Sequence, residues 1–344
     1  MIIEEMLAEQ LAEIIGDYRK GELPIALDKS HVIRWISQFP EESQRVILEE
    51  TLYVFRQWFF DAKQIRMFLS EVYDYVCKCY GKHGDVVFFN DQQEGLSQNA
   101  LVNELQNMGK IMNENSQHSL EKHLVYIDDG LYSGQHIIKD IKYILEKDSS
   151  NICSIDVFVM IGYSAGFQYA KSILEPICTK KGIQFQIYEW KKLLNDRTIH
   201  YSNNSEEYEL CQDTLWPLTP AVQQSDDPKI MIEKITNQHL HYCYREYSRH
   251  YKSRIFSNEN NRKIVENEFL KAGMKILSPE SIKKGIYPLG FSAYPSLGFG
   301  SFCASIMNIS NTCPIVLWWG NLQKDGSELD KWYPLLPRRI NQIY

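Results

Sequence analysis

The stretch Leu124-Val-Tyr-Ile-Asp-Asp-Gly-Leu-Tyr-Ser-Gly-Gln-His136 decides the fold of this chain of 344 residues. It begins with an apolar run typical of a strand that is buried on both faces. The run ends in two acidic residues, Asp128 and Asp129, and a short Ser-Gly loop then leads into a helix that we expect to begin near Ile137. This order of strand, acidic pair, loop and helix is typical of an α/β protein with a parallel sheet.

Each part of this segment has a separate chemical use. The carboxylates of Asp128 and Asp129 can accept hydrogen bonds from sugar hydroxyls or act on the water shell of a metal ion. The backbone N–H groups of the loop and of the first helical turn converge where a phosphate could lie. The alternative interpretation is an ordinary buried strand that ends in a turn, with Asp129 and Gly130 as turn residues.

Strands and helices alternate on both sides of this segment. The pattern predicts four strands, at residues 86–89, 124–127, 155–161 and 183–188. Such alternation implies right-handed crossovers and a parallel sheet, in which ligands bind beyond the carboxyl ends of the strands. We therefore expect one site to be formed by the loops that follow three of these strands, at residues 90–97, 128–136 and 162–167.

The pattern divides the chain into three segments. Residues 1–80 read as a helical region, residues 81–200 as an α/β core, and residues 201–344 as a helical segment followed by a mixed C-terminal extension. Asp28 is expected to cap the second helix. In the last segment we expect helices from 232 to about 251 and over 266–274, and strands over 302–307 and 315–319.

The composition is that of an ordinary soluble globular protein, with 44% hydrophobic and 24% charged residues. The net charge of −7 argues against broad electrostatic capture of nucleic acid, although it leaves a local basic patch open. No apolar run is long enough to span a bilayer, and the N-terminus lacks the basic start of a signal peptide, so we expect a cytoplasmic protein. The eight cysteines lack paired metal-ligand spacing and are expected to be buried, reduced thiols.

The segment 124–136 resembles the ribose-phosphate signature of type I phosphoribosyltransferases: an apolar strand, Asp-Asp, three variable residues, Ser/Thr-Gly, one variable residue and usually Ser or Thr. The resemblance implies an α/β parallel-sheet core of that family. It also implies that Asp128 and Asp129 are catalytic, contact the ribose hydroxyls of phosphoribosyl pyrophosphate, and hold Mg²⁺ directly or through water. The loop that would wrap the 5′-phosphate maps to Gly130, Leu131, Tyr132, Ser133, Gly134, Gln135 and His136.

Two residues of this loop have open roles. His136 stands where the family usually has Ser or Thr, and it either donates a charge-assisted hydrogen bond to the phosphate or faces solvent. Tyr132 either stacks on a base or packs the loop down.

The pyrophosphate side of the site departs further from the family. The matching loop at residues 90–97 contains no Lys or Arg and carries two acids. Ser97 would cap the following helix and leave its N-terminus open to an anion. Our candidates for contacts with pyrophosphate or base are Gly95, Ser97, Ser164 and Arg338.

Further short segments resemble a subgroup of phosphoribosyltransferase-like proteins from bacterial conflict and antiphage systems, at residues 31–39, 287–290, 311–318 and 332–338. This resemblance implies an effector that binds phosphoribosyl pyrophosphate or a nucleotide with Mg²⁺ and transfers or cleaves a ribosyl-phosphate group, with defence-system proteins as partners. The alternative is a catalytically inactive nucleotide sensor or scaffold. Another kind of nucleotide-binding protein ranks lower, because neither a glycine-rich dinucleotide fingerprint nor a Walker-type loop is present.

Overall fold

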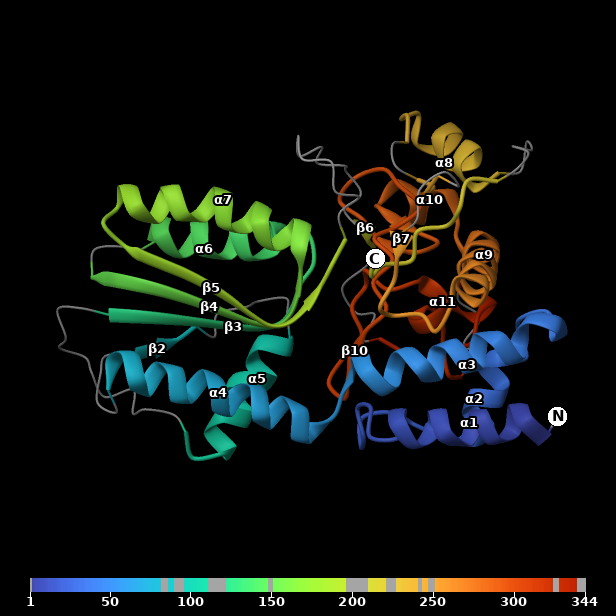
Figure 1. Cartoon of the computed structure of the whole chain (residues 1–344), viewed down its shortest axis with the longest axis horizontal. Coiled ribbons are helices and arrows are strands. Elements are labelled where there is room, and N and C mark those ends of the chain that lie inside the picture. Colours follow the sequence, from blue (N-terminus) through green and yellow to red (C-terminus); the bar gives the residue numbers. More distant parts are fainter. Residues whose placement is uncertain are drawn as a thin grey trace. The chain divides into compact units, whose positions relative to one another are not determined.

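The chain folds into two compact units (Figure 1). The computed structural model describes residues 2–81, 86–89, 96–110, 122–147, 151–195, 210–220, 227–240, 243–246, 251–323 and 328–338. The α/β unit comprises Ala62–Asn195, and the flanking unit comprises Met1–Asp61 together with Asp196–Tyr344. Along the sequence, the α/β unit is therefore an insertion into the flanking unit.

The α/β unit is built on a parallel sheet of four strands, as the sequence predicts. Its strands are β2 (Val86–Phe88), β3 (Lys122–Leu131), β4 (Ile152–Tyr163) and β5 (Gln184–Leu193), and they lie in this order. Every neighbouring pair is parallel. Parallel pairing requires crossover connections, so the carboxyl ends of β3, β4 and β5 meet at one edge of the sheet.

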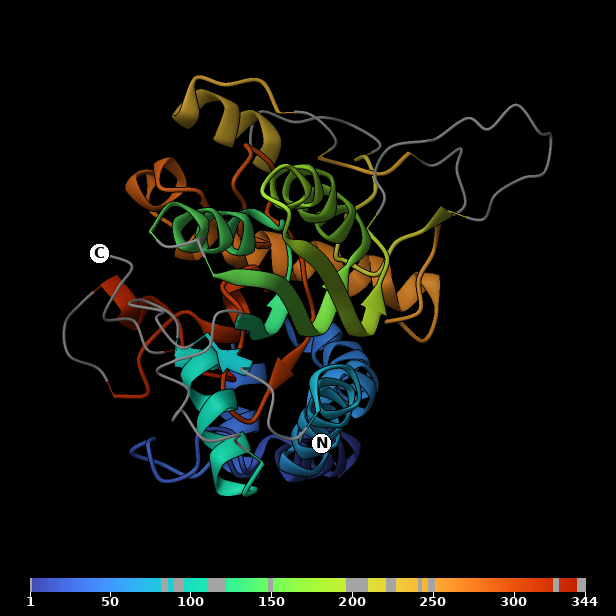
Figure 2. The same cartoon turned by 90° about the vertical axis from the view of Figure 1, so that its left-hand side faces the viewer.

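Helices cover both faces of this sheet (Figure 1, and end-on in Figure 2). One face carries α6 (Gln135–Lys147) and α7 (Ser164–Lys180), and the other carries α4 (Ala62–Tyr80) and α5 (Leu96–Asn107). The first face is packed with buried aliphatic side chains, including Leu124, Val157, Ile141 and Leu174. Burial on both faces explains why the two central strands, β3 and β4, contain long apolar runs.

The helix α4 belongs with the sheet rather than with the helices before it. Its Tyr75 ring lies 5.3 Å from the Phe158 ring of β4 and 5.0 Å from the Tyr188 ring of β5, measured between centroids. The boundary between the two units consequently falls at residues 61 and 62, whereas the pattern of the sequence put residues 1–80 together in one helical region.

The flanking unit joins both ends of the chain. The helices α1 (Ile2–Ile15), α2 (Lys29–Ile36) and α3 (Glu41–Trp58) pack together, and α3 packs on α9 (Glu259–Ile276). The Asp28 side chain accepts a hydrogen bond of 2.9 Å from the His31 N–H, so the predicted cap of the second helix is confirmed. The shorter elements are α8 (Pro228–Thr236), α10 (Pro279–Lys283), α11 (Ile315–Trp318), β1 (Phe59–Phe60), β6 (Leu210–Cys211), β7 (Tyr251–Lys252), β8 (Ile286–Tyr287), β9 (Gly290–Phe291), β10 (Ala304–Ser305) and the 3-10 helix Glu328–Lys331.

Three sequence predictions for this unit are wrong in part. The run Ile315–Trp318 is helix α11 rather than a strand, and the strand predicted over 302–307 shrinks to β10. A short apolar run buried on all sides does not distinguish helix from strand by its periodicity. The helix predicted from 232 to about 251 ends at Thr236, because Asn237 adopts a left-handed conformation with φ of 52°.

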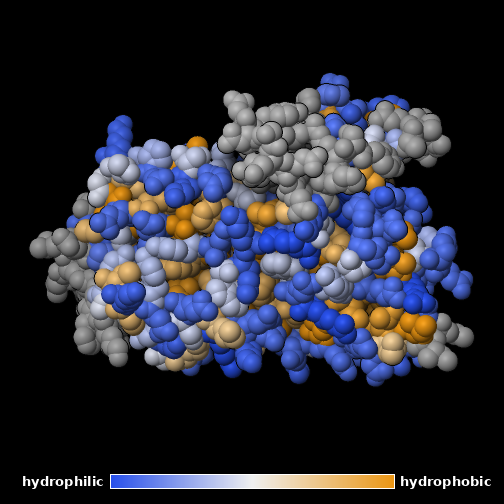
Figure 3. All heavy atoms as spheres, viewed as in Figure 1, coloured by the Kyte–Doolittle hydropathy of each residue, from blue (hydrophilic) through white to orange (hydrophobic). Residues whose placement is uncertain are grey.

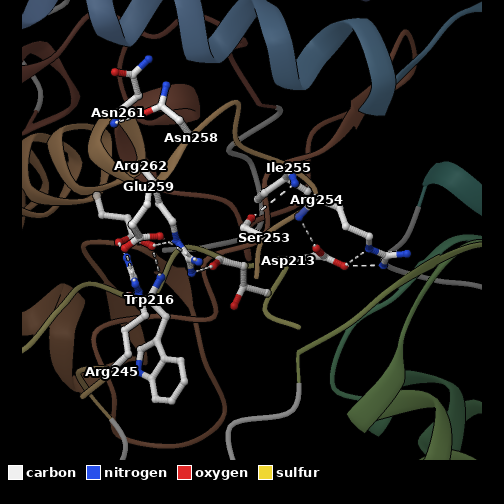
Figure 4. A network of polar contacts seen from close by, with 12 residues as sticks. Asp213, Trp216, Arg245, Ser253, Arg254, Ile255, Asn258, Glu259, Asn261 and Arg262 are labelled. Carbon is white, nitrogen blue, oxygen red and sulfur yellow. Dashed lines mark hydrogen bonds and ion pairs between the residues drawn. The ribbon is translucent and has the colours of Figure 1, made fainter. Parts of the chain in front are cut away.

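A buried ionic network holds loops of the flanking unit against α9 (Figure 4). Arg245 and Arg262 bind the carboxylate of Glu266 at 2.7 and 2.9 Å, and Glu266 also accepts a hydrogen bond of 2.9 Å from the backbone N–H of Trp216. Arg262 and Glu266 are fully buried. Removing one partner from such a network leaves a buried charge that is not fully compensated, so we expect each member to be needed for the stability of these loops.

The C-terminal segment of the flanking unit is fastened to the N-terminal helices. The Nε2 of His31 donates to the Leu335 carbonyl at 2.8 Å, so its Nδ1 accepts the hydrogen bond of 2.7 Å from the Tyr333 hydroxyl. The Trp35 indole N–H donates to the Val316 carbonyl at 2.9 Å. These bonds connect residues about three hundred positions apart.

The exposed hydrophobic side chains do not indicate where a ligand binds. On the face that Figure 3 shows, apolar side chains are interspersed with polar ones. The large hydrophobic side chains with the most exposure are scattered over several elements, and they include Met6, Met67, Tyr143 and Tyr294. Within the described ranges, none of the helices combines the length and apolar character needed to cross a membrane.

Candidate functional site

The acidic pair lies inside strand β3, near its carboxyl end. The sequence predicts that the strand ends at Ile127, but pairing with β4 continues through Asp128, opposite Val159, as far as Leu131, opposite Gly162. Asp128 is 4% exposed and Asp129 is half-buried. The ladder thus fixes the backbone of both acids rigidly.

The carboxylate of Asp128 is tied into the protein. Its Oδ1 accepts a hydrogen bond of 2.9 Å from the backbone N–H of Asp129 and one of 3.0 Å from the Ser97 hydroxyl. Burial raises the pKa of Asp128 to about 6, although these two hydrogen bonds act in the opposite direction. The Asp128 carboxyl therefore gains or loses its proton near pH 6. The ionised form only accepts hydrogen bonds, whereas the protonated form also donates one.

Tyr126 and Asp140 continue the set of polar contacts that begins at Asp128. The Tyr126 hydroxyl donates to Oδ2 of Asp140 at 2.8 Å, and it lies 3.5 Å from Oδ2 of Asp128. His136 lies one helical turn before Asp140, with Nε2 3.4 Å from the same Oδ2, and more than half of its side chain is exposed. His136 thus faces solvent beside Asp140, and its contact with a phosphate stays a prediction. Sequence reasoning missed Tyr126 and Asp140, although Tyr126 lies two residues before Asp128 on the same face of the strand.

The loop after β3 is packed tightly against the start of α7. Gly134 has φ of +78°, and a Cβ there would lie 2.6 Å from the carbonyl oxygen of Gly166. A Cβ on Gly166 would lie 2.7 Å from the Tyr132 carbonyl carbon and even nearer to its oxygen. Only glycine allows this approach of the two backbones, so the shape of the loop depends on both residues.

The Tyr132 ring packs the loop down, which is one of its two predicted roles. It stacks on the Tyr163 ring with a centroid distance of 5.5 Å and an interplanar angle of 30°. It also lies beneath Gly130, where a Cβ would be 2.7 Å from the ring. The Tyr132 ring therefore packs between Gly130 and the Tyr163 ring and supports the conformation of the loop.

The helix α6 begins directly after this loop, at Gln135. Its first backbone hydrogen bond runs from the Ile138 N–H to the Gly134 carbonyl at 3.1 Å. The Gln135 N–H lies 3.5 Å from the Ser133 hydroxyl. The N–H groups of a first helical turn have no partner within the helix, so this turn can bind an anion beside the acidic pair.

The start of α7 is closed by a residue that sequence reasoning missed. The predicted loop 162–167 does not exist, because β4 runs to Tyr163 and α7 begins at Ser164. Asn195 Oδ1 accepts hydrogen bonds from the Ala165 N–H at 2.9 Å and from the Ser164 hydroxyl at 3.2 Å, and the Asn195 N–H donates to that hydroxyl at 3.1 Å. Asn195 therefore caps this helix, and its position just beyond β5 is the signal that could have suggested it.

The other candidates have different surroundings. Ser97 is not a cap, because α5 already begins at Leu96 and the Ser97 hydroxyl is bound to Asp128. Gly95 lies outside the described residues. Arg338 belongs to the flanking unit, where its guanidinium carbon lies 5.5 Å from the centroid of the Trp318 ring. The roles of Gly95, Ser97, Ser164 and Arg338 in ligand binding stay predictions.

The fit of the acidic pair at the carboxyl edge to Mg²⁺ stays a prediction. No group of three or more His, Cys, Asp or Glu residues that could hold an ion occurs in the described part of the chain. Mg²⁺ does not need such a cage, because it binds through one or two carboxylates together with water and ligand phosphates. Asp128 and Asp129 match that smaller requirement.

The sequence also matches a known protein family. The model of the PRTase-CE family matches residues 32–338. The chain belongs to the PRTase-CE family. PRTase abbreviates phosphoribosyltransferase, so the resemblance found in the segment 124–136 is confirmed at the level of the family. No curated protein and no solved structure matches the chain.

The PRTase-CE match extends well beyond the acidic segment. It includes the whole α/β unit and also most of the flanking unit, from α2 to the C-terminal segment at Arg338. The family model therefore covers residues of both units. The assignment to a subgroup from defence systems stays a prediction.

Proposed function

We propose that this PRTase-CE protein binds phosphoribosyl pyrophosphate or a nucleotide, together with Mg²⁺, at the carboxyl edge of its sheet, and transfers or cleaves a ribosyl-phosphate group. One observation carries the proposal. A rigid strand end holds Asp128 and Asp129, and a glycine-packed loop leads from them into the N-terminus of α6. Acceptors for sugar hydroxyls and donors for a phosphate thus lie on one short segment.

The two halves of the segment bind different parts of the ligand in this proposal. The ionised carboxylates accept hydrogen bonds from the ribose hydroxyls, while the loop and the first turn of α6 bind the 5′-phosphate. The hydroxyls of Tyr126 and Ser97 contact the two oxygens of the Asp128 carboxylate, at 3.5 and 3.0 Å. A carboxylate already held in place loses little freedom when the ligand binds.

Transfer breaks the bond between ribose C1 and its leaving group, which departs with the bonding electrons, and forms a bond from C1 to the acceptor, which is water in the case of cleavage. Positive charge develops on the ribose ring as this bond lengthens, and fixed carboxylates beside the ring stabilise that charge. Asp128 and Asp129 would also hold Mg²⁺, directly or through water, and a bound Mg²⁺ neutralises charge on the departing phosphates.

Calorimetry tests the proposal. We expect the full-length protein to bind phosphoribosyl pyrophosphate in the presence of Mg²⁺, and we expect Asp128→Asn and Asp129→Asn each to weaken binding at least tenfold, or by about 1.4 kcal/mol. Asp74→Asn is the matched control, because Asp74 is exposed on α4 and should leave affinity unchanged. Absence of binding by the wild type, or equal affinity of all three variants, contradicts the proposal.

A non-enzymatic function is the second candidate, and it rests on the loop beside the acidic pair. Residues 90–97 contain no Lys or Arg and two acids, whereas a departing pyrophosphate is stabilised by positive charge. A protein of this kind would bind the nucleotide as a sensor or scaffold. Measuring pyrophosphate release during incubation with bound ligand separates the two: binding without turnover favours the sensor.

We further propose that the activity serves antiphage defence with partner proteins of the same system, on the basis of the resemblance of residues 31–39, 287–290, 311–318 and 332–338 to the defence subgroup. Expression of the chain with its neighbouring genes should reduce phage plaque formation. Asp128→Asn in the same background is the control, and equal protection by this variant would separate defence from the acidic site.

A further inference from the structure

The first turn of α5 contains a buried amide without a partner. Gln98 has no exposed surface, and neither its Nε2 nor its Oε1 makes a hydrogen bond. The Oδ1 atom of the next residue, Asn99, is also buried and unpaired. Most buried side-chain amides in folded proteins are hydrogen-bonded, so three unpaired atoms in one helical turn require an explanation.

Gln98 occupies the face of α5 that packs on β3. Leu101, Val102 and Leu105 follow it at helical spacing and are almost completely buried. The preceding residue, Ser97, donates its hydroxyl to Asp128. The Cα–Cβ bonds of a helix tilt towards its N-terminus, so the Gln98 side chain starts towards the end of α5 where Ser97 meets Asp128.

An apolar side chain would serve this position better if packing were its only role. A Gln buried without partners loses its hydrogen bonds to water and gains nothing in return. Met has nearly the same length and shape without polar atoms, and it fills gaps between helix and sheet well. The amide therefore points to a ligand that supplies the missing hydrogen bonds.

We propose that Gln98 is a specificity-determining residue of the acidic site and hydrogen-bonds a sugar hydroxyl of the ligand held by Asp128. This inference rests on the proposed function. A carboxylate only accepts hydrogen bonds, whereas an amide offers both two N–H donors and a carbonyl acceptor. Together they recognise a hydroxyl, which both donates and accepts, and the pair discriminates against ligands that lack it.

Binding through Gln98 involves a movement of α5. The amide has no exposed surface in the unliganded protein, so the first turn of the helix must shift before a ligand reaches it. Once the ligand is bound, this turn gains hydrogen bonds. We expect hydrogen exchange at residues 97–102 to slow when ligand is added, while exchange near the end of α5 changes little.

The substitution Gln98→Met separates a ligand contact from a packing role. Without ligand, the variant should be more stable than the wild type, with Tm raised by about 2–5 °C, because an unpaired buried amide is removed. Its affinity for phosphoribosyl pyrophosphate with Mg²⁺ should fall at least tenfold. Gln106→Met is the control: Gln106 is exposed on the same helix, so both its stability and affinity should stay near the wild-type values.

The outcomes distinguish failure of this inference from failure of the proposed function. If the wild type binds the ligand and Gln98→Met binds it equally well, only the role of Gln98 is overturned. If Gln98→Met lowers the stability of the unliganded protein, the amide is satisfied internally, by a buried water, and the inference is overturned as well. If the wild type does not bind, the proposed function itself fails, and the ligand contact fails with it.

Discussion

Replacing Gly166 by alanine should push the loop after β3 away from α7. The added Cβ would lie 2.7 Å from the Tyr132 carbonyl carbon and 3.0 Å from that of Ser133. Carbon atoms pack comfortably at about 3.5–4.0 Å, so the two backbones must separate by roughly 1 Å. Because both contacts are with backbone, no side-chain rotation relieves them. We expect a loss of about 3 kcal/mol in the free energy of unfolding, the upper end for overpacking.

Thermal unfolding followed by circular dichroism measures this effect. A loss of that size in a unit of this length lowers Tm by on the order of 10 °C. Gly182→Ala is the matched control. Gly182 ends the same helix at φ of +74° with nothing within 4 Å of an added Cβ, so only backbone strain of about 1–2 kcal/mol is expected.

The same variant tests how the loop contributes to ligand binding. Gly166→Ala should weaken binding of phosphoribosyl pyrophosphate, since the displaced loop carries Tyr132 and Ser133 with it. Gly182→Ala should bind like the wild type. A Gly166→Ala protein with wild-type Tm would refute the close backbone approach, and with it the argument that the loop is shaped by its contact with α7.

Three further predictions concern charge and capping. Burial raises the pKa of Asp128 to about 6 in the folded protein, so the stabilisation from proton binding at this carboxyl is present below about pH 4 and is lost as pH rises through 6. In urea unfolding, the free energy of unfolding of Asp128→Asn relative to the wild type should therefore rise by up to about 3 kcal/mol between pH 4 and 7. A difference that stays constant would contradict the burial of this carboxyl. Asn195→Ala removes the cap of α7 and should cost about 1 kcal/mol in the same assay, whereas an unchanged midpoint would argue against the cap. Glu266→Ala leaves Glu259, at 2.7 and 3.9 Å, to pair with both buried arginines, Arg245 and Arg262. One buried positive charge then lacks a matching carboxylate, so thermal melts should show a loss of about 3 kcal/mol for the flanking unit, and a shift below about 1 kcal/mol would show that water reaches the arginines.

The sequence predicted the sheet well because local patterns determine it. The strands β3 and β4 contain apolar runs long enough to stand out, β5 begins with alternating apolar and polar residues, and α6 has a clear apolar face. Its errors at strand ends have a physical cause: Asp128 looks like a terminator, yet the ladder to β4 continues past it because Leu131 is buried beyond. Tertiary packing decided where the strand stopped.

The candidate site was predictable in part for the same reason. The acidic pair and its loop are contiguous in sequence, so their chemistry could be read as one motif. Asn195 and Asp140 act through partners that only the folded chain brings near them. The buried state of Gln98 depends on the face that α5 turns to β3, which the weak amphipathic pattern of that helix does not reveal.

The division of the flanking unit around the α/β unit has a consequence for synthesis on the ribosome. The indole of Trp35 finds its acceptor, Val316, only 281 residues later. At bacterial or eukaryotic rates of elongation, roughly 15–60 s pass between the two. The inserted α/β unit, whose segment is continuous, is complete more than a hundred residues earlier. All residues of the α/β unit are therefore synthesised before the C-terminal residues that pack on α2. Chaperones that bind the apolar side of α2 during this interval would leave the α/β unit free to fold.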